Sequence, residues 1–240
     1  MGIKGCIPIL RDYKEFKKQF KKQQDFKSVG FYPILADRYD AAGVASGHYF
    51  HQDLYVANKI FTANPHRHVD VGSRIDGFVA HVASFREIEI LDIRHIESKS
   101  RNIKFMQADL MSEQFQFPVK TTSLSCLHAI EHFGLGRYGD PMDLDGHKKG
   151  IKNLSNCLTP GGTLYISTPI GQPRIEFNAH RVFGISYLMD LFASNQLSLK
   201  QFSYVNDIGD LVENADPFSV EGKKNFGLKY GCGIFELIKN

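Results

Sequence analysis

The sequence contains no hydrophobic segment long enough to cross a membrane. None of its apolar runs approaches the ~20 residues that span a bilayer, and Met1 to Leu10 lack the apolar core of a signal peptide. With 42% hydrophobic and 23% charged residues, the composition is ordinary for a soluble globular protein. We therefore expect a cytoplasmic protein with one large α/β domain.

Cysteine is scarce, and no two cysteines have CxxC spacing. The four copies are Cys6, Cys126, Cys157 and Cys232. This scatter argues against a zinc knuckle and is typical of reduced thiols in a cytosolic protein. Also absent are a zinc-protease motif, a Walker A phosphate loop and a GxSxG nucleophile elbow.

Local metal-binding motifs are weak as well. Two sets of candidate ligands can be named: His48, His51 and Asp53 in one expected loop, and Asp143, Asp145 and His147 in another. Two histidines three residues apart in a loop are little evidence for a metal. We therefore expect no metal site.

Positive charge is concentrated at the N-terminus. Residues 1–30 hold eight Lys/Arg against three Asp/Glu, a balance of +5, so the remainder of a chain with net charge +3 carries −2. A near-neutral body is not that of a nucleic-acid-binding protein. We expect an N-terminal element over residues 1–30 and a separate domain over residues 31–240.

The basic element has an amphipathic pattern. Tyr13, Phe16 and Phe20 recur at helical spacing, with lysines between them. This helix either packs its aromatic stripe on the body or, through residues 10–28, contacts an anionic membrane or an acidic protein partner.

Beyond residue 31, predicted strands alternate with predicted helices. The strands are His68–Gly72, Glu87–Ile93, Asn102–Gln107, Ser123–Ile130, Thr163–Thr168, Leu199–Val205 and Gly233–Lys239. The helices are Gln52–Ala63, Ile75–Ser84, Asp143–Leu158 and Ile185–Ala193. This alternation predicts a Rossmann-like, doubly wound, seven-stranded and mostly parallel sheet, with the last two strands as an antiparallel hairpin at its edge.

The segment HVDVGSRIDGFVAHVASFREIEILD is the most informative part of the chain. It has the pattern of a strand, a glycine turn, a helix and a second strand, and Asp92 follows Asp70 by 22 residues. In a nucleotide-binding βαβ unit the second acid comes roughly 20 residues later and binds ribose hydroxyls. Arg74 and Asp76 stand where such a turn usually has small residues.

Acidic residues recur at the ends of successive predicted strands. Asp92 follows the second strand and Asp109 the third, while Glu131 and His132 follow the fourth. Ligands of open α/β sheets bind beyond the carboxyl ends of the strands, so these side chains are expected to meet there. Each acid alone is also compatible with a helix cap, but jointly they favour a hydroxyl-bearing ligand such as a nucleoside.

Five of these segments resemble class I S-adenosylmethionine-dependent methyltransferases. They are VDVGS, LDIR, QADL, CLHAIEH and LTPGGTLYISTP, and the likeness covers about Asp70–Asn240. Three further segments, GHYFHQD, HVDVGSRIDGFVAH and FNAHRVF, look like a domain-of-unknown-function family. That family occurs in nematodes and in bacterial surface-polysaccharide gene clusters, and is described as methyltransferase-like.

The resemblance implies roles for particular residues. Asp70, Gly72 and Ser73 would line the methionine portion of S-adenosylmethionine, and Asp92 would take the ribose hydroxyls. Asp109 with Leu110 would border the adenine. His128 and the following residues 129–132 would lie under the sulfonium and face the acceptor.

Arg74 is the departure from the family pattern. Its guanidinium either binds the cofactor carboxylate or an acceptor phosphate, or is held by Asp76 in a turn that has lost the cofactor. We favour the ligand contact. Histidine is the usual base for a hydroxyl acceptor, and His132 and His180 are the first candidates, since they follow the fourth and fifth strands.

The resemblance thus implies methyl transfer from S-adenosylmethionine to a hydroxyl of a sugar or surface-polysaccharide precursor. Two other interpretations stay open. The pocket could serve an enzyme that uses a nucleotide or nucleotide-sugar, or the chain could be a non-catalytic partner that docks through its N-terminal helix.

Overall fold

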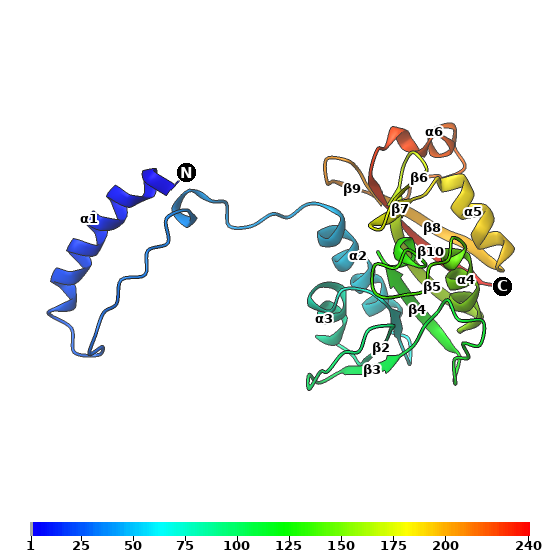
Figure 1. Cartoon of the computed structure of the whole chain (residues 1–240), viewed down its shortest axis with the longest axis horizontal. Coiled ribbons are helices and arrows are strands. Elements are labelled where there is room, and N and C mark those ends of the chain that lie inside the picture. Colours follow the sequence, from blue (N-terminus) through cyan, green and yellow to red (C-terminus); the bar gives the residue numbers. More distant parts are fainter. Residues whose placement is uncertain (1) are drawn as a thin grey trace. The chain divides into compact units, whose positions relative to one another are not determined.

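The computed structural model describes residues 2–240, with side chains from residue 7 onward. The chain divides into two units, one ending at Ala45 and one beginning at Ser46 (Figure 1). Each unit is described by itself.

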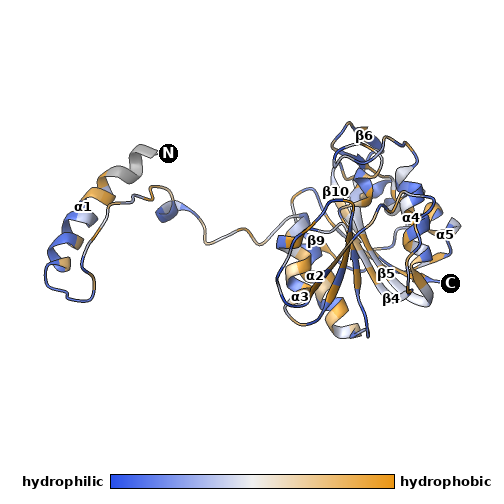
Figure 2. Ribbon diagram, turned by 60° about the horizontal axis from the view of Figure 1, so that its bottom comes forward, coloured by the Kyte–Doolittle hydropathy of each residue, from blue (hydrophilic) through white to orange (hydrophobic). Residues whose placement is uncertain are grey.

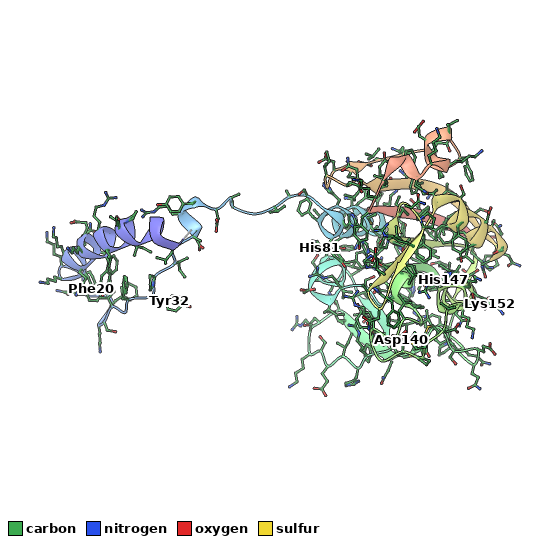
Figure 3. The ribbon with its side chains drawn as sticks, turned by 45° about the horizontal axis from the view of Figure 1, so that its top comes forward. Phe20, Tyr32, His81, Asp140, His147 and Lys152 are labelled. Atoms are coloured by element: carbon green, nitrogen blue, oxygen red, sulfur yellow. The ribbon has the colours of Figure 1, made fainter. Side chains whose placement is uncertain are left out.

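The N-terminal unit is one helix followed by an irregular segment. Helix α1 spans Gly2–Phe20, and the 3₁₀ turn η1 spans Asp37–Tyr39. The ring of Tyr13 lies 4.6 Å from that of Phe31, so the irregular segment covers part of the predicted aromatic stripe. Phe16 stays half exposed. Figure 3 labels Phe20, the last residue of α1, and Tyr32 in the irregular segment. Among the helices of residues 2–240, none has the length and apolar character that crossing a bilayer requires.

The second unit is built on an eight-stranded sheet in the order β3-β2-β1-β4-β5-β10-β8-β9. The bounds are β1 Val69–Val71, β2 Ile88–Asp92, β3 Ile103–Gln107, β4 Thr121–Leu127, β5 Leu158–Ile170, β8 Leu197–Val205, β9 Leu211–Val212 and β10 Gly231–Lys239. The first five strands are parallel, whereas β10 runs antiparallel to both β5 and β8. The predicted Rossmann-like sheet with antiparallel edge strands is confirmed.

The number of strands differs by one from the prediction. Strand β9 is two residues long, too short for an alternating pattern to show in the sequence. A separate two-stranded sheet, β6 Arg174–Glu176 with β7 His180–Val182, was also not predicted. In addition, β5 begins at Leu158, before the Pro-Gly-Gly turn that was expected to separate helix from strand.

Helices cover both faces of this sheet (Figure 1). Helix α2 (His48–Ala63) and α3 (Ala80–Ala83) pack on one face, where Val56, Phe78 and Ile90 belong to one core. Helices α4 (Gly146–Asn156) and α5 (Ile185–Ser194) pack on the other face over a second core. Figure 2 shows the apolar colour on the strands between these layers. The short α6 (Val220–Lys223) and 3₁₀ turn η4 (Asn225–Gly227) follow β9.

The helix predicted over Ile75–Ser84 is wrong in its first half. Residues Ile75–Val79 form the π-helical turn η2, within which Gly77 has non-helical φ −122° and ψ −108°. A Cβ on Gly77 would lie 2.5 Å from the Asp53 carboxylate of α2. The close approach of that buried acid explains both the glycine and the break in the helix.

Candidate functional site

Two neighbouring hollows lie at the carboxyl ends of the parallel strands. The first has a volume of about 540 Å³ and is lined from the ends of β1, β2 and β4 and from the segment after β3. The second has a volume of about 1390 Å³. Five residues line both, so the hollows are continuous: Gly72, Arg94, His128, His132 and Tyr138.

Asp70 holds the turn that separates β1 from the hollows. Its carboxylate accepts hydrogen bonds from the Ser73 backbone N–H (3.0 Å), the Ser73 hydroxyl (2.6 Å) and the Ser125 hydroxyl (2.5 Å). Burial raises the pKa of Asp70 to about 6, although these three donors oppose the shift. Asp70 lines neither hollow, so its place is beneath the turn rather than in the wall.

Gly72 brings the backbone of this turn into the wall. Its φ of +69° is a conformation that only glycine adopts at low cost. A Cβ added there would lie 3.0 Å from the Cβ of Ala129. Two features therefore favour glycine at this position: the left-handed backbone conformation and the closeness of Ala129.

Asp92 lies in the first hollow at the end of β2, as predicted, and its side chain is nearly buried. Arg94 donates to both carboxylate oxygens: its backbone N–H (2.8 Å) and Nε (3.0 Å) reach Oδ1, and a terminal nitrogen (2.8 Å) reaches Oδ2. A carboxylate offers about four lone-pair sites. Three are filled here, which leaves one on Oδ2.

The far side of the first hollow is mainly apolar. Leu91, Leu110 and Ala129 are buried and line it, as a flat aromatic base would require. Asp109 lines it too, and one of its oxygens accepts the Met111 backbone N–H at 2.8 Å. The second oxygen of Asp109 is not used in that bond.

A glycine-containing loop after β4 closes this hollow. Asp140, labelled in Figure 3, accepts hydrogen bonds from the backbone N–H groups of Gly134 (2.8 Å), Gly136 (3.2 Å) and Tyr138 (3.1 Å). One carboxylate thus fixes the loop that carries Tyr138 into both hollows.

The second hollow contains three guanidinium groups. Arg74, Arg94 and Arg137 all line it, and the described residues that line it include two acids, Asp76 and Glu131. Arg94 lies over the ring of Tyr138 at 4.3 Å. Because guanidinium groups bind phosphate and carboxylate bidentately, this wall suits an anionic ligand.

Arg74 is paired with Asp76 in this structure. Its Nε and a terminal nitrogen donate to the two carboxylate oxygens at 3.2 and 3.1 Å, and its guanidinium lies 4.7 Å from the centre of the Tyr49 ring. Half of the Arg74 side chain is exposed, and Asp76 is more exposed still. Exposed pairs of this kind contribute little energy, so the pairing leaves Arg74 free to exchange Asp76 for a ligand.

Both predicted bases, His132 and His180, line the second hollow. The Nδ1 of His132 lies 2.6 Å from the Ala179 carbonyl, which can only accept, so Nδ1 carries the proton and Nε2 has the free lone pair. Burial lowers the pKa of His132, although the Glu131 carboxylate opposes the shift. The His180 ring packs 5.1 Å from Tyr230, and burial lowers its pKa as well.

Glu131 is a buried acid in the middle of this group. It lies 2.6 Å from Nδ1 of His128 and 3.7 Å from Nε2 of His132. Its role was not predicted, although the sequence His-x-x-Glu-His placed it between both imidazoles. Arg94 was given no role although it ends the LDIR segment, and Arg137 and Tyr138 were missed because they follow β4 without a recognisable motif.

The sequence matches the model of one protein family. Residues 76–211 match the family described as Caenorhabditis protein of unknown function, DUF268. This chain belongs to that family. The match covers more than half of the chain and includes Asp92, Asp109 and both candidate bases. No curated protein matches the sequence.

Solved structures with a similar fold include S-adenosylmethionine-dependent methyltransferases. A S-adenosylmethionine-dependent methyltransferase from Clostridium acetobutylicum is 11% identical with a TM-score of 0.55, over 95% of this chain and 99% of that one. The N-methyltransferase NodS from Bradyrhizobium japonicum, solved with S-adenosylhomocysteine, is 10% identical with a TM-score of 0.52, over 80% and 88%. The cyclase SpnF is 12% identical with a TM-score of 0.50, over 72% and 75%. At these identities the similarity shows the fold, and SpnF shows that the fold also serves other chemistry.

Proposed function

We propose that this DUF268 member transfers a methyl group from S-adenosylmethionine to a hydroxyl of an anionic sugar, such as a phosphorylated or nucleotide-linked precursor of a polysaccharide. The observation that carries the proposal is the continuity of the two hollows. One has a carboxylate and apolar walls suited to an adenosine, and the other has three histidines and three guanidinium groups.

The residues of the first hollow fit the cofactor. Asp92 would accept the ribose hydroxyls, and Asp109 with Leu110 would border the adenine. Gly72 allows the backbone to approach without a Cβ in the way. Arg94 occupies most of the Asp92 carboxylate, but its side chain is half exposed and can turn toward the second hollow that it also lines.

When bound, S-adenosylmethionine supplies an electrophilic methyl group on a sulfonium. The chain's residues then have two tasks. The guanidinium groups of Arg74, Arg94 and Arg137 hold the acceptor's negative charge and set its orientation, since alignment of the reacting atoms supplies much of the rate. Nε2 of His132 accepts the hydroxyl proton as the oxygen attacks, and the Ala179 carbonyl keeps the ring in the required tautomer.

The proposal of an anionic sugar acceptor rests on the three arginines. The proposed link to polysaccharide rests on the family resemblance. A transfer assay with methyl-labelled S-adenosylmethionine and a panel of nucleotide-sugars tests both. Label should appear in at least one nucleotide-sugar and not in the neutral free sugars. Label in neutral sugars alone would contradict the role of the arginines.

A second candidate function uses the same pocket for a nucleotide-sugar without methyl transfer. The three guanidinium groups that line the second hollow favour it, because they suit the diphosphate of such a ligand. Binding of a uridine or guanosine diphosphate sugar in the absence of any S-adenosylhomocysteine binding would support it.

A non-catalytic role for the N-terminal unit remains a separate proposal. Its helix leaves Ile7, Leu10 and Phe16 exposed beside the lysines, a surface suited to a protein or peripheral membrane partner. Deleting residues 1–28 should abolish such an association and leave the second unit folded.

A further inference from the structure

We propose that His48, His128 and Cys232 form a binding site for a transition-metal ion of the zinc class. One ligand atom from each of the three side chains lies within 4.8 Å of the other two. His48 begins helix α2, His128 follows β4, and Cys232 is on β10. The fold therefore assembles the site from three distant parts of the chain, which is why no local motif indicated it.

The first independent observation is the free nitrogen of His128. Its Nε2 is fully buried and has no hydrogen-bond partner among the described residues. Its Nδ1 lies 2.6 Å from the buried Glu131 carboxylate. A carboxylate on one imidazole nitrogen, with the other directed at a metal, is the usual arrangement around a metal-binding histidine. A buried nitrogen without a partner is otherwise destabilising.

The second observation is the packing of His48. Its ring stacks on that of His128 with centres 5.3 Å apart and an angle of 11°, and Tyr230 stacks on it at 5.3 Å. The two histidines are therefore held beside each other by packing.

Cys232 supplies the third ligand. Its thiol is buried and unbridged, and Sγ lies 3.6 Å from Gln52 Oε1, a long contact for this weak donor. One thiolate and two imidazoles are ligands that zinc prefers, whereas calcium and magnesium require oxygen. Zinc bonds of about 2.0–2.3 Å place tetrahedral ligand atoms roughly 3.3–3.8 Å apart. Metal binding therefore requires ligand atoms that lie up to 4.8 Å apart to approach within this range.

The site borders the second hollow, because His128 lines that hollow. Three protein ligands leave a fourth position for water or a ligand oxygen, as in catalytic zinc sites. Variants of His48 and Cys232 can test the metal site separately from methyl transfer, since neither residue lines either hollow.

Metal analysis of the full chain tests this site. After purification under reducing conditions and incubation with Zn²⁺, mass spectrometry should find about one zinc per chain. In the metal-stripped chain, Co²⁺ should produce a thiolate-to-cobalt absorption band. The band should vanish in Cys232→Ser and persist in Cys157→Ser, which changes a buried cysteine outside the cluster.

Two further variants test the site even if Cys232→Ser does not fold. His48→Gln changes a half-buried side chain and should lower zinc affinity at least tenfold while S-adenosylhomocysteine binding is retained. Glu131→Gln should lower zinc affinity about 10–100-fold through His128. A metal-free wild-type chain without a cobalt band would overturn the proposal, and so would zinc uptake unchanged in both His48→Gln and Cys232→Ser.

Discussion

Arg94 donates three hydrogen bonds to the carboxylate of Asp92, at 2.8, 3.0 and 2.8 Å, and it also lines the hollow next to the one where Asp92 lies. The same guanidinium therefore either occupies the cofactor's ribose site or faces the acceptor. This makes Arg94 the residue most able to link the two hollows.

Arg94→Gln separates the two roles. The variant should bind S-adenosylhomocysteine as well as wild type or a fewfold more tightly, because a competing donor is removed from Asp92. Its KM for an anionic acceptor should rise about tenfold, the size expected for one lost charge-assisted contact. Titration calorimetry and steady-state kinetics measure the two effects. Arg101→Gln, at an exposed position outside both hollows, is the control. Loss of cofactor-product binding in Arg94→Gln would contradict the exchange.

Gly72→Ala should weaken both the fold and the cofactor site. The left-handed φ costs about 1–2 kcal/mol in any L-residue, and the new Cβ meets Ala129 at 3.0 Å. Gly161→Ala is a matched control, with a φ of +77° and open space around its Cβ. Urea unfolding should show a larger loss for Gly72→Ala. Equal losses would mean that Ala129 does not restrict this turn.

A buried histidine should make the fold sensitive to acid. His68 is fully buried between the hydroxyls of Ser123 (2.8 Å) and Ser125 (3.1 Å), and burial lowers its pKa from 6.5 to about 3. The unfolded chain therefore binds a proton below pH 6.5 that the folded chain excludes. The stability that depends on a neutral His68 is complete above pH 6.5 and is lost as the pH falls toward 3.

His68→Gln isolates this effect, because glutamine does not titrate. The difference in free energy of unfolding between wild type and variant should shrink by ~1.4 kcal/mol per pH unit below pH 6.5, or about 2 kcal/mol by pH 5. Denaturant unfolding at several pH values measures it. A difference that stays constant with pH would show that His68 is not the acid-sensitive group.

The two candidate bases should differ in their effects on rate. His132 is oriented by the Ala179 carbonyl, whereas the His180 ring packs against Tyr230. His132→Gln should lower kcat by about 10²–10⁴ with little change in cofactor binding, and His180→Gln should act mainly on the acceptor KM. The exposed His95→Gln serves as control. The reverse pattern would assign the base to His180.

The fold was largely predictable from local patterns. Strand β2 buries its apolar residues Ile88, Ile90 and Leu91, and helix α5 buries residues that recur with the 3.6-residue period. The predictions that failed concern elements that are very short or locally irregular. Strand β9 has two residues, and the turn η2 departs from a helix because Gly77 packs against Asp53, a contact that no local pattern encodes.

The residues of the candidate site were predictable only where they directly follow the ends of strands. Asp92 and Asp109 lie in the first hollow because parallel strands end at one edge. Asp70 was placed in the wall, but its buried carboxylate is used by Ser73 and Ser125. The cluster of His48, His128 and Cys232 depends on tertiary packing between residues up to 184 positions apart, so the scattered cysteines gave no signal of it.

Titration of the full chain with S-adenosylhomocysteine tests the central claim most directly. We predict micromolar binding to wild type, at least tenfold weaker binding to Asp92→Ala, and unchanged binding to Asp190→Ala, which alters an exposed acid of α5. No binding to wild type, together with binding of a uridine or guanosine diphosphate sugar, would contradict the methyltransferase account.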